Sequence, residues 1–315
     1  MTDNIHDSAY EAQDNEAGEV IGPEPYEKLT ISNFFIFSKV MSNPEICTEF
    51  LRRAFPDLEI GKVIPVAESS HQISPGLKGV RFDVYASDGN HLFDLECQTV
   101  SRGNLPQRSR YYNCILDADQ LDSGRDYSEL KPVYIIFICT FALGYGGKHK
   151  YAFRRYCMEN RELALNDGTE IVFFSTKGTE QDIDVPMQRF LDYVDGCADP
   201  EQEDDEFIRK LDGFVRYART RPDWRRQYMD LQMLIKEERA EAEARADRAE
   251  EEAARAKAET SRAKAETSRA KAETSRAKAD LEKVIVGMIK SGVDGNTVMK
   301  IAGISRDELE KYRHM

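Results

Sequence analysis

Apolar and polar positions alternate in two neighbouring runs between residues 80 and 98. In the first run, every second residue is apolar: Val80, Phe82, Val84 and Ala86. In the second run, the residues with the same spacing are Phe93, Leu95 and Cys97. A Ser-Asp-Gly-Asn turn separates the two runs, so the pattern predicts a β-hairpin with one apolar face and one polar face.

The polar face of this hairpin carries the candidate chemistry. With the Asp-Gly pair as a two-residue loop, Asp83 lies opposite Asp94, and Arg81 lies opposite Glu96. Glu96 is then a diagonal neighbour of Asp83, at roughly 7 Å between backbone positions. Carboxylates placed in this way can converge on one hard cation, which prefers oxygen ligands. The alternative is an ordinary solvated strand face with an Arg81–Glu96 cross-strand pair.

Helical and strand patterns alternate through the rest of residues 25–230. The spacing of apolar residues predicts helices over about 34–43, 44–54, 104–119 and 186–196. Continuous β-branched and aromatic runs over 132–140 and 171–175 predict strands that are buried on both faces. The glycine-rich stretch 144–150 lacks P-loop spacing, and we interpret it as a loop in which His149 is solvated. Together these patterns predict a mixed α/β core.

The chain changes character after residue 230, where Glu, Ala, Arg and Lys dominate. The heptad Arg-Ala-Lys-Ala-Glu-Thr-Ser repeats from Arg255, with a truncated fourth copy. Good helix formers and pairs such as Arg255–Glu259 predict a long solvated helix over 231–280. Because alanines are the only apolar residues in the repeats, the seam is poor for a coiled coil, and we expect no more than a weak homo-oligomer.

Residues 281–315 form a separate short pattern of three helical segments, with Gly303 in a turn. The arrangement resembles a helix-turn-helix, for which DNA reading is one possible role. A small interaction or oligomerisation cap is the alternative, because the last segment carries charges of both signs.

The net charge of −13 is concentrated in two places. Residues 1–25 contain seven acids and no Lys or Arg, and residues 201–206 contain five more acids. The remainder is therefore near neutral, which permits nucleic-acid binding without demonstrating it. We predict that residues 1–24 are a disordered acidic tail.

The cysteines and the longest apolar runs indicate where the protein works. The six cysteines contain no C-x-x-C pair, which argues against a zinc site and fits a reducing compartment. No apolar run reaches membrane-spanning length, and the first residues are acidic, unlike those of a signal peptide. We therefore expect a cytoplasmic protein without a membrane partner.

Three sequence blocks resemble the PD-(D/E)XK nuclease fold. They are Phe82-Asp83-Val84-Tyr85, then Asp94-Leu95-Glu96-Cys97-Gln98, then Leu105-Pro106-Gln107-Arg108-Ser109-Arg110-Tyr111-Tyr112. More narrowly, they resemble the bacterial PD-(D/E)XK transposase and recombination-promoting nuclease family, which commonly carries E-x-Q in place of E-x-K. The likeness extends from Tyr26 to about Tyr228. It implies a restriction-endonuclease-like mixed sheet flanked by helices.

The resemblance also implies an activity: a DNA endonuclease that hydrolyses phosphodiester bonds with Mg²⁺, for which Mn²⁺ can substitute. Asp83 and Glu96 are the implied metal ligands, and the Cys97 backbone carbonyl completes the set. Gln98 joins Asp83 and Glu96 as a catalytic residue, in the place of the usual lysine. Arg108, with its helix neighbours, would bind DNA phosphates.

The phosphate-binding face comprises Arg108, Arg110 and Tyr112 on the helix predicted over 104–119. The alternative is that its tyrosines pack in the core and its arginines are solvated. The family often has an acid near the first helix, where this chain has Ser32-Asn33. Glu49 is a candidate substitute, although a helix-surface glutamate is its simpler interpretation.

Two rival functions are also consistent with the sequence. One is a non-catalytic DNA-binding or assembly protein that retains the nuclease fold, which the missing lysine and the Asn33 region favour. The other is a structural adaptor built around the long helix. Retention of both core acids, Asp83 and Glu96, favours the enzyme.

Overall fold

The computed structural model describes residues 24–71 and 80–313. The predicted acidic tail lies outside the described residues, apart from Glu24. The chain divides into two compact units, Met1–Ile235 and Lys236–Met315. The four-part division inferred from the sequence stays a prediction. Within the described ranges, no helix is both long enough and apolar enough to cross a membrane.

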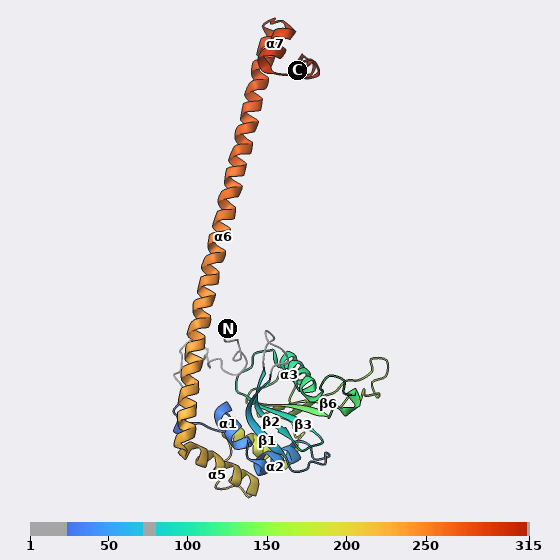
Figure 1. The fold of residues 1–315 in the computed structure, drawn as a ribbon, viewed down its shortest axis with the longest axis vertical. Helices are drawn as coiled ribbons and strands as arrows, with labels where there is room; N and C mark the ends of the chain where they lie inside the picture. Colours follow the sequence, from blue (N-terminus) through green and yellow to red (C-terminus); the bar gives the residue numbers. More distant parts are fainter. Residues whose placement is uncertain (1–23, 72–79, 314–315) are drawn as a thin grey trace. The chain divides into compact units, whose positions relative to one another are not determined.

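A six-stranded sheet with the order β1-β2-β3-β4-β6-β5 forms the centre of the first unit (Figure 1). Its strands are β1 (Ile64–His71), β2 (Val80–Ser87), β3 (Leu92–Gln98), β4 (Val133–Cys139), β5 (Lys150–Phe153) and β6 (Thr169–Ser175). β3, β4 and β6 are parallel to one another, and the other neighbouring strands pair antiparallel. The sheet is therefore mixed, as predicted.

Helices cover both faces of this sheet. One face packs against α1 (Phe34–Met41), α2 (Pro44–Ala54), α4 (Val185–Val194), α5 (Glu206–Thr220) and the first turns of α6 (Pro222–Lys290). The other face packs against α3 (Leu105–Gln120). Short 3₁₀ helices lie at η1 (Tyr26–Lys28) and η2 (Tyr127–Glu129). The predicted mixed sheet with flanking helices and a long C-terminal helix is confirmed.

Several helices begin where the sequence supplies a capping side chain, and α2 and α5 are examples. The Asn43 side chain accepts the backbone N–H groups of Glu45 and Ile46 at the start of α2, and Pro44 occupies the first turn, where its missing N–H costs nothing. The Asp205 side chain caps α5 in the same way by accepting from Phe207. The Asn43 cap explains why the start of α2 predicted from the sequence agrees with the structure.

Two strands and one histidine differ from expectation. β1 and β5 were not predicted, because each is an edge strand and carries exposed apolar residues such as Ile64 and Phe153. His149 was expected in solvent, and this was wrong. Its side chain is 5% exposed, and its ring Nδ1 lies 3.0 Å from the Ser175 carbonyl oxygen.

The second unit contains most of α6 together with α7 (Gly295–Ala302) and α8 (Arg306–Arg313). Ile285, Val298 and Leu309, one from each helix, form its small buried core. Gly303 ends α7 with a φ of 66°, a left-handed conformation that glycine adopts without strain. The short helices on either side of Gly303 agree with the sequence pattern.

Candidate functional site

The β2–β3 hairpin has a different register from the predicted one. Tyr85, not Asp83, pairs with Asp94, and Ser87 pairs with Leu92, so the turn spans four residues rather than two. The turn is lengthened by Asp88, whose carboxylate accepts the backbone N–H groups of Asn90 and His91. The expected diagonal relation of the two acids was therefore wrong.

The corrected register brings Asp83 and Glu96 directly together across the two strands. The Asp83 N–H donates to Glu96 Oε1 at 3.1 Å, and the Cys97 N–H donates to Asp83 Oδ2 at 3.2 Å. Both acids are buried, with 6% and 1% of their surface exposed. Burial, and then the nearby charges of Asp83 and Asp94, raises the pKa of Glu96 well above its usual value.

Strand alternation is interrupted at Asp83. Val84 belongs to the core beneath α1 and α2, whereas Phe82 belongs to the core beneath α3. The predicted single apolar face for residues 80–86 was therefore wrong. The regular pairing with β3 ends at Val84–Leu95, and beyond it the carboxylates of Asp83 and Glu96 bind backbone N–H groups of the opposite strand. These side-chain contacts replace part of the strand ladder.

Arg108 of α3 joins Glu96 and Gln98 into one network. Its Nη2 donates to Glu96 Oε2 at 3.2 Å, and its Nη1 donates to Gln98 Oε1 at 2.8 Å. Gln98 Nε2 in turn donates to Glu96 Oε2 at 3.3 Å. Glu96 thus forms its ion pair with Arg108 from the helix above, and not with Arg81 from the neighbouring strand.

Tyr112 lies below the surface, not on an open binding face. Only 2% of Tyr112 is exposed, its ring meets Phe82 edge-to-face, and its hydroxyl accepts from Arg108 Nη2 at 2.9 Å. The guanidinium also lies 5.3 Å from the centre of the Tyr112 ring. The expectation that Tyr112 contacts phosphate disagrees with this burial, and Tyr112 instead orients Arg108. Arg110 is exposed on the outer face of α3.

Asp94 is a third acid near this site, and no separate role for it was predicted from the sequence. It is completely buried, and among the described residues neither of its carboxylate oxygens has a hydrogen-bond partner. Burial, followed by the charge of Asp83, raises the pKa of Asp94 well above its usual value. Its spacing from Glu96, two residues along the same strand, was the sequence signal that placed both acids on one face.

The acid that the resembled family often has near its first helix is replaced in this chain by Ser32-Asn33, which have other contacts. The Cys97 thiol lies 3.5 Å from the Ser32 carbonyl oxygen, so this segment does border the end of β3. Asn33, however, caps α1 by accepting from the Phe35 N–H. Glu49 accepts from Arg53 on α2 and lines a separate pocket, so it does not supply the missing acid.

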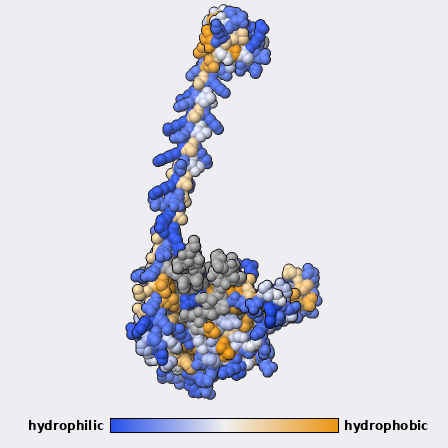
Figure 2. Space-filling model, viewed as in Figure 1, coloured by the Kyte–Doolittle hydropathy of each residue, from blue (hydrophilic) through white to orange (hydrophobic). Residues whose placement is uncertain are grey.

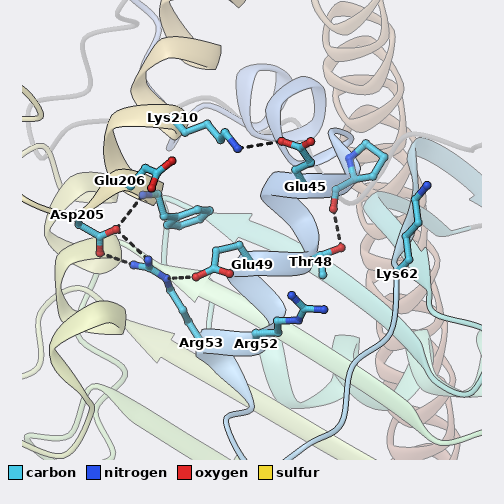
Figure 3. Close-up of a pocket in the computed structure, with 11 residues that line it drawn as sticks. Glu45, Thr48, Glu49, Arg52, Arg53, Lys62, Asp205, Glu206 and Lys210 are labelled. Carbon is cyan, nitrogen blue, oxygen red and sulfur yellow. Dashed lines mark hydrogen bonds and ion pairs between the residues drawn. The ribbon is translucent and has the colours of Figure 1, made fainter.

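That separate pocket, of about 600 Å³, lies between α2 and α5 (Figure 3). Its charged side chains largely bind one another. Arg53 donates to both oxygens of Asp205 at 2.6 and 2.9 Å, and Lys210 donates to Glu45 at 2.9 Å. The Arg53 guanidinium also stacks 4.3 Å from the Phe207 ring. These contacts join the two helices, and the pocket contains none of the acids of β2 and β3.

Within the described part of the chain, no group of three or more His, Cys, Asp or Glu side chains is arranged to hold a metal ion. Asp83 and Glu96 are linked across the two strands, and Asp94 is near enough for its charge to contribute, after burial and the charge of Asp83, to the raised pKa of Glu96. Any cation held here would therefore need oxygen ligands beyond side chains, such as a backbone carbonyl or water.

Comparison with known proteins identifies one family. A family model described as PD-(D/E)XK nuclease family transposase matches residues 35–229, which is more than half of the chain and includes the whole sheet. No curated protein matches the chain. The matched region contains Asp83, Glu96, Gln98 and Arg108.

Proposed function

This chain belongs to the PD-(D/E)XK nuclease family transposases, and from that premise we propose that it is a metal-dependent DNA endonuclease that hydrolyses phosphodiester bonds. The observation that supports the proposal most strongly is the Asp83–Glu96 pair. These two buried acids are held across β2 and β3 by backbone N–H donors, beside Gln98 and Arg108. Burying two neighbouring acids costs desolvation free energy, which an apolar pair at the same positions would not cost.

Nucleases of this fold generally use divalent metals such as Mg²⁺, and the residues present fit such an ion. Asp83 and Glu96 are neighbouring buried carboxylates, and burial and then the charge of Asp83 raise the pKa of Glu96, so a cation between them relieves their repulsion. We propose that both carboxylates hold it, with the Cys97 carbonyl as a third ligand. When bound, a divalent cation polarises a phosphoryl oxygen and lowers the pKa of a bound water.

Gln98 and Arg108 have complementary roles in this proposal. Gln98 contributes an oriented amide where related nucleases have a lysine, so it can position water or phosphate but cannot neutralise charge. Arg108 contacts both Glu96 and Gln98 and supplies the positive charge that Gln98 lacks. We therefore propose Arg108 as a positioning residue that orients these two side chains, itself held by Tyr112.

DNA binding requires contacts outside this buried network. Arg110 is exposed on α3 and lies two residues from both Arg108 and Tyr112, so it projects from the opposite side of the helix. An exposed guanidinium suits a phosphate oxygen, because it can donate two parallel hydrogen bonds. We propose that Arg110 contacts the DNA backbone from the outer side of α3.

A plasmid assay tests the proposed activity. Supercoiled plasmid is incubated with the purified chain and Mg²⁺, alongside Asp83→Ala and the exposed-acid control Asp122→Ala. We expect nicking by wild type and by Asp122→Ala, and none above background by Asp83→Ala or with chelator. Equal nicking by all three proteins would assign the activity to a contaminant. DNA binding without nicking under any divalent metal would favour a non-catalytic DNA-binding or assembly protein that retains the fold.

A further inference from the structure

The charges of α6 follow a heptad pattern that the apolar residues alone do not reveal. When Thr260 is assigned to position a of the heptad abcdefg, Ala263 falls at d, Lys264 at e and Glu266 at g. The a and d residues over 242–284 then form a continuous face of small and apolar side chains. They are Ala242, Ala246, Ala249, Ala253, Ala256, Thr260, Ala263, Thr267, Ala270, Thr274, Ala277, Leu281 and Val284.

This face is exposed in the single chain throughout 242–284. At its C-terminal end, Leu281 is 44% exposed and Val284 is 52% exposed, which is high for large apolar side chains. Figure 2 shows pale and tan residues running along α6 between blue ones. The helix therefore carries an uncovered face that ends in two larger hydrophobic residues.

The residues that flank this face are complementary in a parallel pair of helices. In a parallel, in-register pair, residue g of one helix lies beside residue e of the next heptad on its partner. Five consecutive pairs of this kind have opposite charges. They are Arg245–Glu250, Glu252–Lys257, Glu259–Lys264, Glu266–Lys271 and Glu273–Lys278. Among the described residues, none of Glu259, Lys264, Glu266, Lys271, Glu273 and Lys278 forms an ion pair within its own chain.

Other arrangements place like charges together. An antiparallel pair of helices that used the same face would place g residues beside g residues and e residues beside e residues. Glu266 would then lie beside glutamates, and Lys264 would lie beside lysines. A second face, formed by Ala265, Ser268 and their heptad equivalents, would be flanked by Arg and Lys on both sides. Charge repulsion therefore disfavours both alternatives and leaves one orientation and one face.

The threonines at position a can be buried without leaving an unsatisfied hydroxyl. Each hydroxyl of Thr260, Thr267 and Thr274 donates to the backbone carbonyl four residues earlier, at 2.8–2.9 Å. Their methyl groups can therefore face a partner helix at little polar cost. With alanines at d, the two helices can approach closely along this face.

We propose that α6 pairs with α6 of a second copy of this chain as a parallel, in-register coiled coil over residues 242–284. The five interchain charge pairs, each formed twice, fix the orientation, and Leu281 and Val284 become covered at the end of the seam. The pairing brings two copies of the Asp83–Glu96 site into one assembly. It does not depend on whether that site cleaves DNA.

Charge reversal of the full-length chain tests the pairing. Analytical ultracentrifugation of wild type should show a reversible dimer of twice the 36.0 kDa chain. Changing Lys264, Lys271 and Lys278 to Glu should raise the dimer dissociation constant roughly a hundredfold, because six interchain pairs become repulsive. Changing Glu259, Glu266 and Glu273 to Lys should do the same, and mixing the two variants should restore a heterodimer.

The matched control reverses the same number of charges away from the seam, by changing Arg262, Arg269 and Arg276 to Glu. These are c positions, so the dimer should persist. A disulfide-trapping experiment checks the register. Ala263→Cys at d should form an interchain disulfide under mild oxidation, whereas Ala265→Cys at f should resemble wild type. The proposal would be overturned if the wild type were monomeric. It would also be overturned if the lysine and arginine reversals changed the dimer dissociation constant equally, or if the two cysteine variants formed equal amounts of interchain disulfide.

Discussion

Gln98 provides the sharpest test of the proposed mechanism, because both ends of its side-chain amide are bonded. Its Nε2 donates to Glu96 Oε2 at 3.3 Å, and its Oε1 accepts from Arg108 Nη1 at 2.8 Å. Gln98→Ala removes both contacts and the oriented donor beside the acids. Losing one oriented donor at a developing charge typically costs about 3–4 kcal/mol, so we expect nicking to fall by roughly 10²–10³-fold.

Two further substitutions separate charge from geometry at this position. Gln98→Lys should retain or raise activity, because an ammonium donates to Glu96 and also supplies charge. Gln98→Glu should lose activity, because it places a second carboxylate at the Glu96 oxygen that now accepts a hydrogen bond.

The assay is single-turnover nicking of supercoiled plasmid at saturating protein, with rates normalised to the folded fraction from circular dichroism. DNA affinity, measured separately by fluorescence anisotropy, should change less than about twofold in each variant, because the side chain acts on the chemical step. A nicking rate for Gln98→Ala within twofold of wild type would remove Gln98 from the mechanism.

Three other predictions follow from single features of the structure. Arg110→Ala should weaken DNA binding uniformly across sequences and reduce the slope of log affinity against log salt by about one, measured by anisotropy. Asp205→Asn keeps the α5 cap but weakens the pair with Arg53, so it should lower the free energy of unfolding at pH 7 by about 1.5–3 kcal/mol. The Arg53 hydrogen bond lowers the pKa of Asp205, so this stabilisation is present above the unfolded-state pKa of about 3.9 and is lost as pH falls through the lower folded value. Urea melts at pH 7 and pH 3 check this, and an equal deficit at both would contradict it. A peptide of residues 231–280 should be partly helical at low salt and less so at high salt, and random coil at low temperature would refute the solvated helix.

Much of the fold follows from the sequence because local signals and packing agree. Asn43 followed by Pro44 marks the start of α2, and the β-branched run before Thr140 marks β4, which is buried on both sides. β1 and β5 were missed because edge strands lack a continuous apolar pattern. The pattern of apolar residues therefore identified the central elements but not the edge strands.

The sequence identified the two acids of the candidate site but not how they lie relative to each other. The motif spacing selected Asp83 and Glu96, yet their direct juxtaposition depends on the turn that Asp88 lengthens. Hairpin register is set by such turn contacts, and a one-residue change in one strand would exchange its two faces. Likewise, nothing in the helical spacing of Tyr112 could show that its hydroxyl faces inward toward Arg108.

Calorimetric titration of Mn²⁺ into the free protein tests most directly whether Asp83 and Glu96 form one cation site. Wild type and the exposed-acid control Asp122→Asn should bind one ion, whereas Asp83→Asn and Glu96→Gln should each bind at least about tenfold more weakly, because a two-acid site loses half of its carboxylate charge. Asp83→Asn and Glu96→Gln should weaken Mn²⁺ binding equally, because both carboxylates hold the same ion. Equal Mn²⁺ binding by all four proteins would contradict the account.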